Sequence, residues 1–273
     1  MPHSHRISVV MPVFCHTPDH ELFLREALGS VAGQTFKDME LVIVDDVSPV
    51  DIIPIVESID GLPETRILRN ATNMGHAESR NIGVRAAQAD LIAFLDHDDI
   101  WLPEKLERQL AAMEKNMDAA MVFCDMEMFG ENANRLNIDQ SIIPQRPGFY
   151  WFVCHGNFTI SASAVLVRKQ AMLDIGGFDS RYSTCDDFDA WLKILMDAPV
   201  VHIPKKLARY RLHSANVNYS VDRLNDNKLL TALIWRYWKR ASLAEKVLLI
   251  PRFVRKYIGR LYFAIWRFRK FGN

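Results

Sequence analysis

The sequence has few cysteines and no long hydrophobic segment. Its four cysteines, Cys15, Cys124, Cys154 and Cys185, lie far apart without a C-x-x-C pair. This spacing excludes a disulfide framework and a structural zinc signature, and it suits a reducing cytosol. The uncharged stretch 147–167 is interrupted by glycine, histidine, asparagine and hydroxyl residues, which makes it a poor membrane span. No charged region followed by an apolar one opens the chain, so we expect no signal peptide.

The whole chain also lacks an excess of charge of either sign, because 33 basic and 33 acidic residues balance among 273. This balance argues against a general nucleic-acid-binding protein. The charges are unevenly placed, because residues 228–273 hold twelve basic residues and one acid, Glu245. Residues 1–227 hold 21 basic and 32 acidic residues, so an acidic body of net charge −11 carries a basic tail of +11. With 49% hydrophobic residues, we expect one α/β domain with an appendage.

Short apolar runs alternate with helical patterns in the first half of the chain. Strands are expected at 7–14, 40–45, 65–69, 91–95 and 121–124, and helices at 21–33, 76–89 and 103–115. The alternation predicts an α/β fold with a mostly parallel central sheet flanked by helices. After residue 126 the pattern is less regular, with strands expected at 163–168, 200–203 and 207–212 and a helix at 186–196. Functional groups of such sheets gather at the carboxyl ends of strands.

Three acids in four positions follow one of these strands: Asp96, Asp98 and Asp99, with His97 between them. Carboxylates this close repel one another unless a cation is bound. A hard divalent ion with oxygen ligands, Mg²⁺ or Mn²⁺, is a natural guest and keeps open positions for substrate phosphates. The alternative is an acidic turn or a helix N-cap, and the motif alone does not decide between the two.

Two further groups of polar residues are candidates for nucleotide binding. Asp45 and Asp46 end a predicted strand, where a carboxylate can accept hydrogen bonds from a base or a ribose. An N-cap or an Asx turn is the alternative there. Asn73 and Gly75 form a turn before a helix, whose N-terminus favours anions. Arg80, about a turn and a half into that helix, can reach an acid or a phosphate, although it could also be a surface arginine at a loop–helix junction.

A second acidic cluster, Asp186, Asp187 and Asp189, opens the last predicted helix of the body. A carboxylate at this position can act as a general base toward an acceptor hydroxyl. The alternative is that the acids compensate the dipole at the helix N-terminus. The last predicted strand ends in Tyr210-Arg-Leu-His213, where arginine and histidine could meet a diphosphate or a metal. A lone histidine is more often structural.

Together and in this order, the motifs resemble those of the family 2 glycosyltransferases, which have the GT-A (nucleotide-diphospho-sugar transferase) fold. The resemblance covers about residues 6–215. It rests on the blocks Val9-Val-Met-Pro-Val-Phe14, Leu41-Val-Ile-Val-Asp-Asp46, Asn73-x-Gly75…Arg80-Asn81-x-Gly83, Phe94-Leu-Asp-His-Asp-Asp99, Trp101-x-Pro-x-Lys105, Gly176-Gly-Phe-Asp179, Asp186-Asp-Phe-Asp-x-Trp191 and Tyr210-Arg-x-His213. It implies a catalytic domain at 1–218, with a nucleotide-binding half at about 1–115 and an acceptor-binding half at 116–218, followed by a tail at 219–273.

The resemblance also implies roles for particular residues. Asp187 matches the catalytic base, and Asp186 stands where the family has glutamate, which leaves the assignment between the two neighbours open. Asp96 and Asp98 match the D-x-D motif that holds Mn²⁺ or Mg²⁺, with Asp98 on the metal, Asp96 nearer the ribose and His213 as a further metal ligand. The nucleotide-sugar is expected to meet Pro12, Val13, Asp45, Asp46, Asn73, Gly75, Arg80, Asp96 and His97.

The implied reaction is the transfer of one sugar from a nucleotide-sugar, a UDP-sugar, to a hydroxyl of a glycan acceptor in a single displacement with inversion. Processive members carry Q-x-x-R-W and membrane spans, whereas this chain has Lys206-x-x-Arg209-Tyr210 and no span. A lipid-linked acceptor in cell-surface polysaccharide or lipopolysaccharide synthesis is the expected setting. One alternative is a non-catalytic sugar-nucleotide-binding or scaffold protein. Another is a sugar-1-phosphate nucleotidyltransferase, whose glycine-rich signature is missing after Met11-Pro12.

The basic tail has an amphipathic pattern. On a helical wheel of residues 251–270, five basic residues fall within about a quarter turn, opposite a mainly apolar face. This pattern predicts a helix on an anionic membrane surface, which would make the protein peripheral at the inner face of the cytoplasmic membrane. The alternatives are a helix packed on the acidic body and an interface between copies of the chain.

Overall fold

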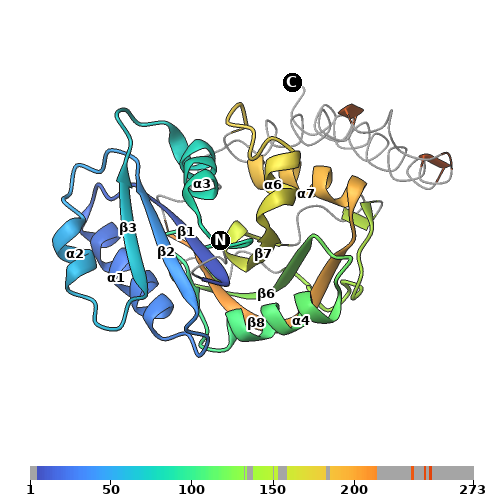
Figure 1. Ribbon diagram of the computed structural model, residues 1–273, viewed down its shortest axis with the longest axis horizontal. Helices are drawn as coiled ribbons and strands as arrows, with labels where there is room; N and C mark the ends of the chain where they lie inside the picture. The colour runs from blue at the N-terminus through green and yellow to red at the C-terminus, as the bar shows by residue number, and fades with distance from the viewer. Residues whose placement is uncertain are drawn as a thin grey trace, which may run out of the picture.

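The computed structural model describes residues 5–131, 133, 138–149, 151–152, 159–182 and 185–213, together with Trp235, Arg236, Leu243, Lys246 and Val247. One eight-stranded sheet in the order β3-β2-β1-β4-β7-β6-β8-β5 runs through this part of the chain (Figure 1). Helices cover both faces of the sheet, which confirms the predicted α/β class.

The first half of the sheet is parallel. It contains β1 (Ile7–Val13), β2 (Met39–Asp45), β3 (Glu64–Arg69) and β4 (Leu91–Phe94). Every residue of β1, β2 and β4 is buried, as expected for strands covered on both faces, whereas the edge strand β3 is half-buried. The carboxyl ends of β1, β2 and β4 therefore meet at one edge, where the predicted acids follow.

The second half of the sheet is mixed. β7 (Val165–Arg168) lies antiparallel between β4 and β6 (Met121–Phe129), and β8 (Val200–Arg211) runs parallel to β6. The two-residue strand β5 (Ile100–Trp101) pairs antiparallel with β8 at the edge. The segments predicted as strands at 200–203 and 207–212 both belong to β8. Register shifts on either side of Asp125 let a single bulged strand continue through both segments.

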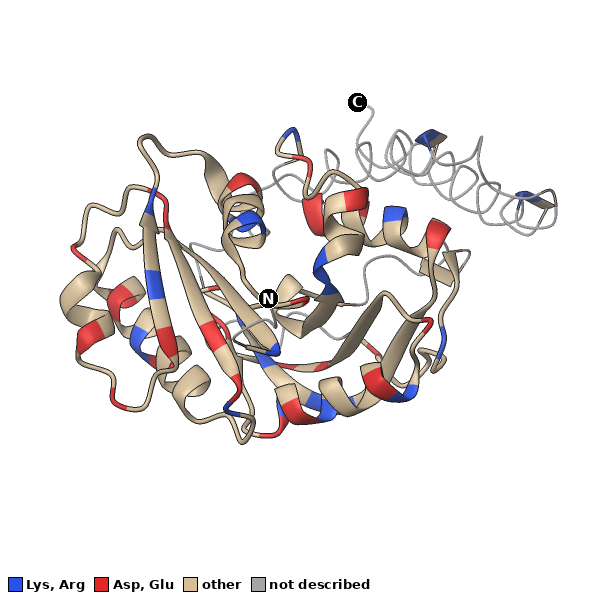
Figure 2. Cartoon of the chain, viewed as in Figure 1, with Lys and Arg blue, Asp and Glu red and all other residues tan. Residues whose placement is uncertain are grey.

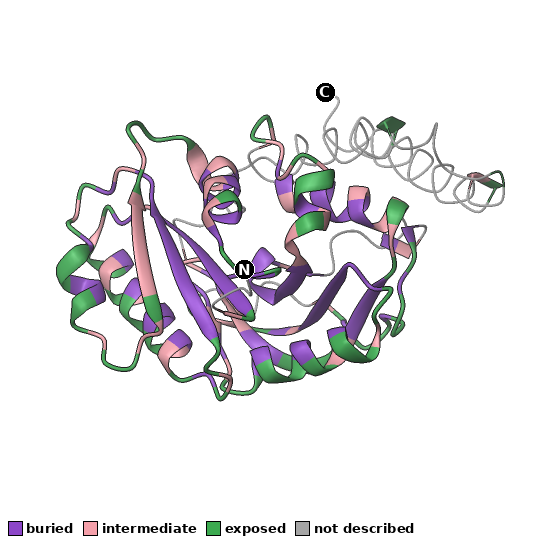
Figure 3. Ribbon diagram, in the orientation of Figure 1, coloured by how far each residue is buried: buried purple, intermediate pink, exposed green. Residues whose placement is uncertain are grey.

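Two hydrophobic cores lie on opposite faces of the sheet (Figures 1 and 3). One is closed by α1 (Pro18–Ala32), α2 (Ile53–Glu57) and α4 (Lys105–Lys115). The other is closed by α3 (Gly75–Ala86), α6 (Lys169–Asp174) and α7 (Asp186–Asp197). Figure 3 shows the strands largely buried and the outward sides of α1 and α4 exposed, which is the amphipathic pattern that the sequence predicted.

The predicted helices are confirmed, with shifted ends. α1 begins at Pro18, where Thr17 accepts a capping hydrogen bond from the backbone N–H of His20. α4 begins at Lys105, two residues after the predicted start. The strand predicted at 163–168 begins as the 3₁₀ turn η2 (Ala162–Ala164) before β7. The short elements α2, α6 and β5 were not predicted, because a few residues show no clear periodicity.

Among the described residues, none of the helices combines the length and apolarity needed to cross a bilayer. Figure 2 shows acidic and basic positions interspersed along α4 and the other covering helices. The predicted basic helical tail lies outside the described residues except for the five named above. The boundaries predicted at 115/116 and 218/219 remain predictions.

Candidate active site

A pocket lies where β1 and β4 end, against the first turns of α3 and α7. Nine of the residues predicted to act in function line it: Pro12, Val13, Asp46, Arg80, Asp96, His97, Asp98, Asp186 and Asp187. They come from segments that are far apart in the sequence. The parallel half of the sheet brings the strand-end residues together, and the two helices direct their N-terminal turns at the same point.

Four predicted residues do not line this pocket: Asp45, Asn73, Gly75 and His213. The buried Asp45 carboxylate accepts the backbone N–H of Ser48 at 2.9 Å and forms an ion pair with Arg69. The Asn73 side chain donates to the backbone carbonyl of Asp46 at 3.2 Å. Asp45 and Asn73 therefore hold the turn that carries Asp46, and the contact of Asp45 with a nucleotide base remains a prediction.

Asp46 caps α3. Its two carboxylate oxygens accept the backbone N–H groups of Met74 and Gly75, each at 2.8 Å, and the side chain of Asn70 donates to it at 2.7 Å. Gly75 has φ +80°, a conformation that glycine adopts without strain. The anion expected at this helix N-terminus is thus a carboxylate of the protein itself.

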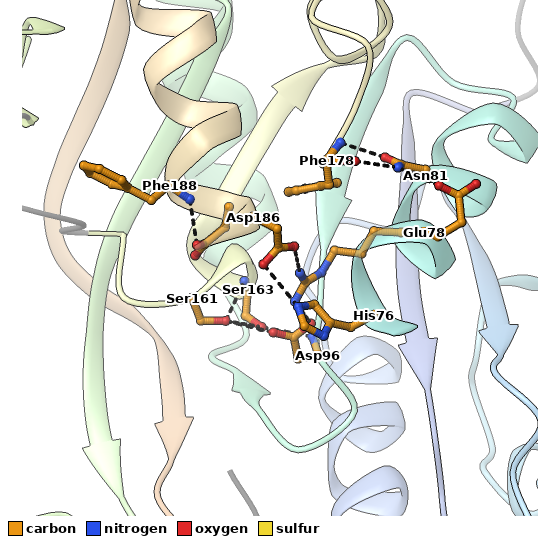
Figure 4. Close-up of polar contacts among 11 residues, drawn as sticks. His76, Glu78, Asn81, Asp96, Ser161, Ser163, Phe178, Asp186 and Phe188 are labelled. Atoms are coloured by element: carbon orange, nitrogen blue, oxygen red, sulfur yellow. Dashed lines mark hydrogen bonds and ion pairs between the residues drawn. The ribbon is translucent and has the colours of Figure 1, made fainter. Parts of the chain in front are cut away.

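Arg80 links the two acidic clusters. Its Nη2 donates to Asp96 at 2.6 Å and its Nη1 donates to Asp186 at 2.9 Å (Figure 4). The side chain is 7% exposed, and although burial lowers its pKa, the charges of Asp96 and Asp186 outweigh that effect and raise it. Arg80 is therefore a fixed cation that neutralises carboxylates on both sides of the pocket.

The two neighbouring acids of α7 have different environments. Asp186 is buried, and besides Arg80 it meets Nε2 of His76 at 3.1 Å, so each of its oxygens has a strong partner. Burial alone would raise the pKa of Asp186, but the hydrogen bond from His76 and the charge of Arg80 lower it overall. Asp187 is half-buried, lines the pocket and accepts the backbone N–H of Phe188 at 2.7 Å.

The loop after β4 holds the other acids in distinct settings. Asp98 lies 3.1 Å from Nε2 of His213; burial raises the pKa of Asp98, but this hydrogen bond and the charges of His97 and His213 together lower it overall. Asp99 is fully buried and accepts the backbone N–H of Arg211 at 3.1 Å. Burial and the neighbouring charges of Asp98 and Asp96 raise the pKa of Asp99 well above its ordinary value. The predicted acidic cluster therefore contains a pocket-lining anion and a buried carboxyl that supports the loop.

The donor atoms near Asp98 fit a cation that shares its coordination with a substrate. Asp98 and His213 offer one oxygen and one nitrogen close together. No group of three or more His, Cys, Asp or Glu side chains within the described ranges is placed to hold a metal by itself. Mg²⁺ and Mn²⁺ commonly take their remaining ligands from water and phosphate oxygens. Asp96, in contrast, uses its oxygens on Arg80 and on the hydroxyl of Ser161.

Sequence reasoning missed several residues of the site. Ser161 lies within hydrogen-bond distance of Asp96 and Asp99, at 3.1 and 3.0 Å, and Ser163 accepts the backbone N–H of Asp96 at 3.0 Å. Ile160, just before them, lines the pocket at φ +67°, which is unusual for a β-branched residue and typical of a constrained functional loop. These residues precede an antiparallel strand, so the rule of carboxyl strand ends did not find them.

The fold and the site together define a glycosyltransferase with the GT-A fold: a mixed sheet, acids at the strand ends and an acidic pair opening α7. The family model described as Glycosyl transferase family 2 matches residues 8–172, and the chain belongs to this family. The resemblance inferred from the motifs is thereby confirmed, as is the enzymatic class.

Relatives and solved structures agree with this assignment. An uncharacterised glycosyltransferase of Methanocaldococcus jannaschii is 30% identical over 242 residues, which cover 85% of this chain and 79% of that protein. One of Haemophilus influenzae is 28% identical over 241 residues, which cover 88% and 79%. The crystal structure of residues 1–349 of S. aureus TarS in complex with UDP has a TM-score of 0.64 at 19% identity, covering 88% of this chain and 77% of that one. A second TarS structure contains UDP-GlcNAc and also has a TM-score of 0.64, at 18% identity, covering 90% and 79%.

Proposed function

We propose that this glycosyltransferase moves one sugar from a UDP-sugar to a hydroxyl of a glycan acceptor, with inversion at the anomeric carbon and Asp187 as the general base. A UDP-sugar is favoured as donor because the TarS structures with the same fold contain UDP and UDP-GlcNAc. A single displacement is proposed because Asp187 matches the catalytic base of inverting family members, while its neighbour Asp186 is held in an ion pair with Arg80.

The observation that supports this proposal most is the difference in environment between Asp186 and Asp187. Asp186 is held by Arg80 at 2.9 Å and by His76 at 3.1 Å, which makes it a weak proton acceptor. Asp187 belongs to the same helical turn but lines the pocket and is half-buried. A carboxylate in such a position can take the proton of a bound hydroxyl.

The reaction then assigns a task to each group of residues. Asp187 accepts the proton of the acceptor hydroxyl while that oxygen attacks the anomeric carbon from the face opposite the diphosphate. Arg80 holds Asp96 and Asp186 in place through its two ion pairs. A Mn²⁺ or Mg²⁺ ion held by Asp98 and His213, with Asp96 nearby, would offset the charge that develops on the leaving nucleoside diphosphate.

A donor screen tests the reaction. UDP-, GDP- and dTDP-sugars are incubated with the protein and Mn²⁺, and the released nucleotide is measured. We expect release from one UDP-sugar, and a loss of about 10²- to 10⁴-fold in Asp187→Asn with UDP binding retained. Asp197→Asn, an exposed carboxylate at the end of the same helix, is the matched control and should keep full turnover. Unchanged turnover in Asp187→Asn would reject Asp187 as the base.

The same screen separates the alternatives. A sugar-nucleotide-binding or scaffold protein would bind UDP but release no nucleotide from any donor. A nucleotidyltransferase would form pyrophosphate from a nucleoside triphosphate and a sugar 1-phosphate. Adding EDTA to the active protein tests the metal: we expect loss of turnover that Mn²⁺ or Mg²⁺ restores, whereas activity in EDTA would reject metal dependence.

We further propose that the acceptor is lipid-linked, in cell-surface polysaccharide or lipopolysaccharide synthesis, and that the protein works at the cytoplasmic face of the membrane. Support comes from the twelve basic residues and single acid of residues 228–273. Among the described residues of this tail, Trp235, Leu243 and Val247 are exposed large apolar side chains. Exposed apolar groups within a strongly basic segment suit an anionic lipid surface.

Vesicle co-sedimentation tests the membrane proposal. The full chain should bind vesicles with about 30% phosphatidylglycerol and leave phosphatidylcholine vesicles unbound, a composition chosen for its negative surface charge. Changing Arg252, Lys256 and Arg260 to Gln should weaken binding at least tenfold, because each basic residue contributes about 1 kcal/mol at such a surface. Equal binding by this variant, or equal binding to both vesicle types, would contradict the proposal.

A further inference from the structure

Two residues of α3 bind the side chain of Asp186, the first residue of α7. His76 and Arg80 are four positions apart and therefore lie on the same face of α3. Both reach the carboxylate of Asp186, His76 through Nε2 at 3.1 Å to Oδ1 and Arg80 through Nη1 at 2.9 Å to Oδ2 (Figure 4). In the proposed function His76 only weakens Asp186 as a proton acceptor, although His76 also lines the pocket.

Arg80 alone does not fix the direction of Asp186. Its other terminal nitrogen holds Asp96 at 2.6 Å, so its guanidinium is shared between two carboxylates. A carboxylate held through a single oxygen can still rotate about its terminal torsion, which has a broad energy well. The second contact, from His76 to Oδ1, removes that freedom.

The direction of Asp186 matters because this residue ties the start of α7 to α3. The N-cap residue Cys185 makes no side-chain capping hydrogen bond, and Asp186 is the first residue of the helix. Its side chain is 4% exposed and is tied to α3. Asp187 follows immediately, so the position of the proposed base depends on how firmly Asp186 is held.

α3 also holds the segment that leads into α7. The Asn81 side chain donates to the carbonyl of Phe178 at 2.9 Å and accepts its backbone N–H at 2.8 Å, as Figure 4 shows. Gly177 permits this approach, because a Cβ there would lie 2.4 Å from Oδ1 of Asn81. One edge of α3 thus contacts both the start of α7 and the segment before it. It consists of His76, Arg80 and Asn81, and His76 lies nearest the N-terminus of α3.

We propose that His76 is a positioning residue for catalysis: it fixes the Asp186 carboxylate against Arg80 and thereby sets the place of Asp187 in the pocket. This inference rests on the proposed role of Asp187. The chain offers a matched control in His5, whose Nε2 lies 3.2 Å from Glu64. Glu64 is 56% exposed, and neither residue lines the site pocket, so this pair repeats the contact with an exposed carboxylate in place of a buried one.

The first experiment compares nucleotide release from the active donor by wild type, His76→Ala, His76→Gln and His5→Ala. We expect His76→Ala to lower kcat by about 10- to 100-fold, with the donor KM and the affinity for UDP within twofold of wild type. His76→Gln keeps an N–H donor, so its kcat should lie within about threefold of wild type. His5→Ala should have the kcat of wild type. The proposal would be overturned if His76→Ala raised the donor KM and left kcat unchanged. It would also be overturned if His76→Ala and His76→Gln lowered kcat equally.

A second measurement does not depend on activity. Hydrogen–deuterium exchange of the amides of residues 187–190 should be at least fivefold faster in His76→Ala than in wild type, and unchanged in His5→Ala. Unchanged exchange in His76→Ala would overturn the inference even if the protein proves to be a glycosyltransferase. Faster exchange together with full turnover in Asp187→Asn would instead reject the proposed base while leaving the contact with α7 established.

Discussion

Lys105, the first residue of α4, is fully buried and leads to a prediction about stability. Its Nζ donates to Oε1 of Gln109 at 2.8 Å and lies 4.0 Å from the centre of the Trp101 ring. Burial lowers the pKa of Lys105 from 10.5 to about 7, and the neighbouring Cys124 opposes this shift slightly. Replacing Lys105 by Met removes the titrating group while keeping an unbranched side chain in the core.

The magnitude follows from this pKa. Between pH 7 and pH 10.5 the unfolded chain holds a proton on Lys105 that the folded protein has lost, so the wild type becomes more stable as the pH rises. The slope is at most about 1.4 kcal/mol per pH unit, which amounts to about 2 kcal/mol from pH 7 to pH 9. The Trp101 ring stabilises the protonated amine by roughly 1 kcal/mol, so the measured change should be somewhat smaller.

Urea unfolding followed by tryptophan fluorescence at pH 7, 8 and 9 measures the effect. The free energy of unfolding of wild type, taken relative to Lys105→Met, should increase by about 1 to 2 kcal/mol over this range. Lys115→Met, an exposed lysine of the same helix, should give a curve parallel to that of wild type. Parallel curves for wild type and Lys105→Met would refute the reasoning, because the buried amine would then keep its proton in the folded protein.

Three further substitutions have expected outcomes. Gly177→Ala should lower the free energy of unfolding by about 2 to 4 kcal/mol in denaturant titrations, because φ is +75° and the new Cβ would collide with Asn81; a loss under 0.5 kcal/mol would contradict this. Glu40→Gln should cost about 2 to 3 kcal/mol at pH 7, since the buried carboxylate is bonded to Ser8, Gln88 and Arg66. Burial raises the pKa of Glu40, but these bonds lower it overall. The difference in stability between wild type and Glu40→Gln should therefore shrink as the pH falls below 4.5. A difference in Tm that stays constant over this pH range would contradict the reasoning. Arg211→Lys should reduce nucleotide release at least tenfold, because Arg211 donates to the carbonyl of Asp98 at 2.8 Å and stacks on two aromatic rings; full activity would show that the loop needs no such support.

Most of the fold could be predicted from the sequence, because hydrophobic runs and helical periodicity are local properties. The strands of the parallel half and the helices α1, α3, α4 and α7 were predicted within a few residues. Asp46, Arg80, Asp96 and Asp187 were placed at one site because parallel strands and their following helices must converge. What a motif cannot supply is the partner of each side chain. Asp46 caps α3 through a contact set by three-dimensional register, and it also lines the pocket, so its contact with a nucleotide remains a prediction.

The missed features depend on contacts between distant segments. Ser161 meets Asp96 across 65 residues of chain, and His76 meets Asp186 across 110. Neither serine nor histidine carried a local signal strong enough to separate it from a surface residue. The buried amine of Lys105 was likewise invisible, because lysine on an amphipathic helix is normally exposed. The metal, the acceptor and the membrane surface remain predictions.

The direction of β7 has a consequence for how enzymes of this kind can diversify. Because β7 runs antiparallel to β4, its beginning and the end of β4 lie at the same edge, where Ser161 and Ser163 both bond to Asp96 and Ser161 lines the pocket. The connection from Phe129, at the end of β6, to Ser161 is therefore anchored to the sheet at both ends. Chimeras can exchange its exposed positions between homologues, provided that Phe149 and Phe152, which are buried in the core, are retained. We expect such chimeras to keep the donor site while altering which acceptor is used, so new linkages could arise in evolution without remodelling the sheet.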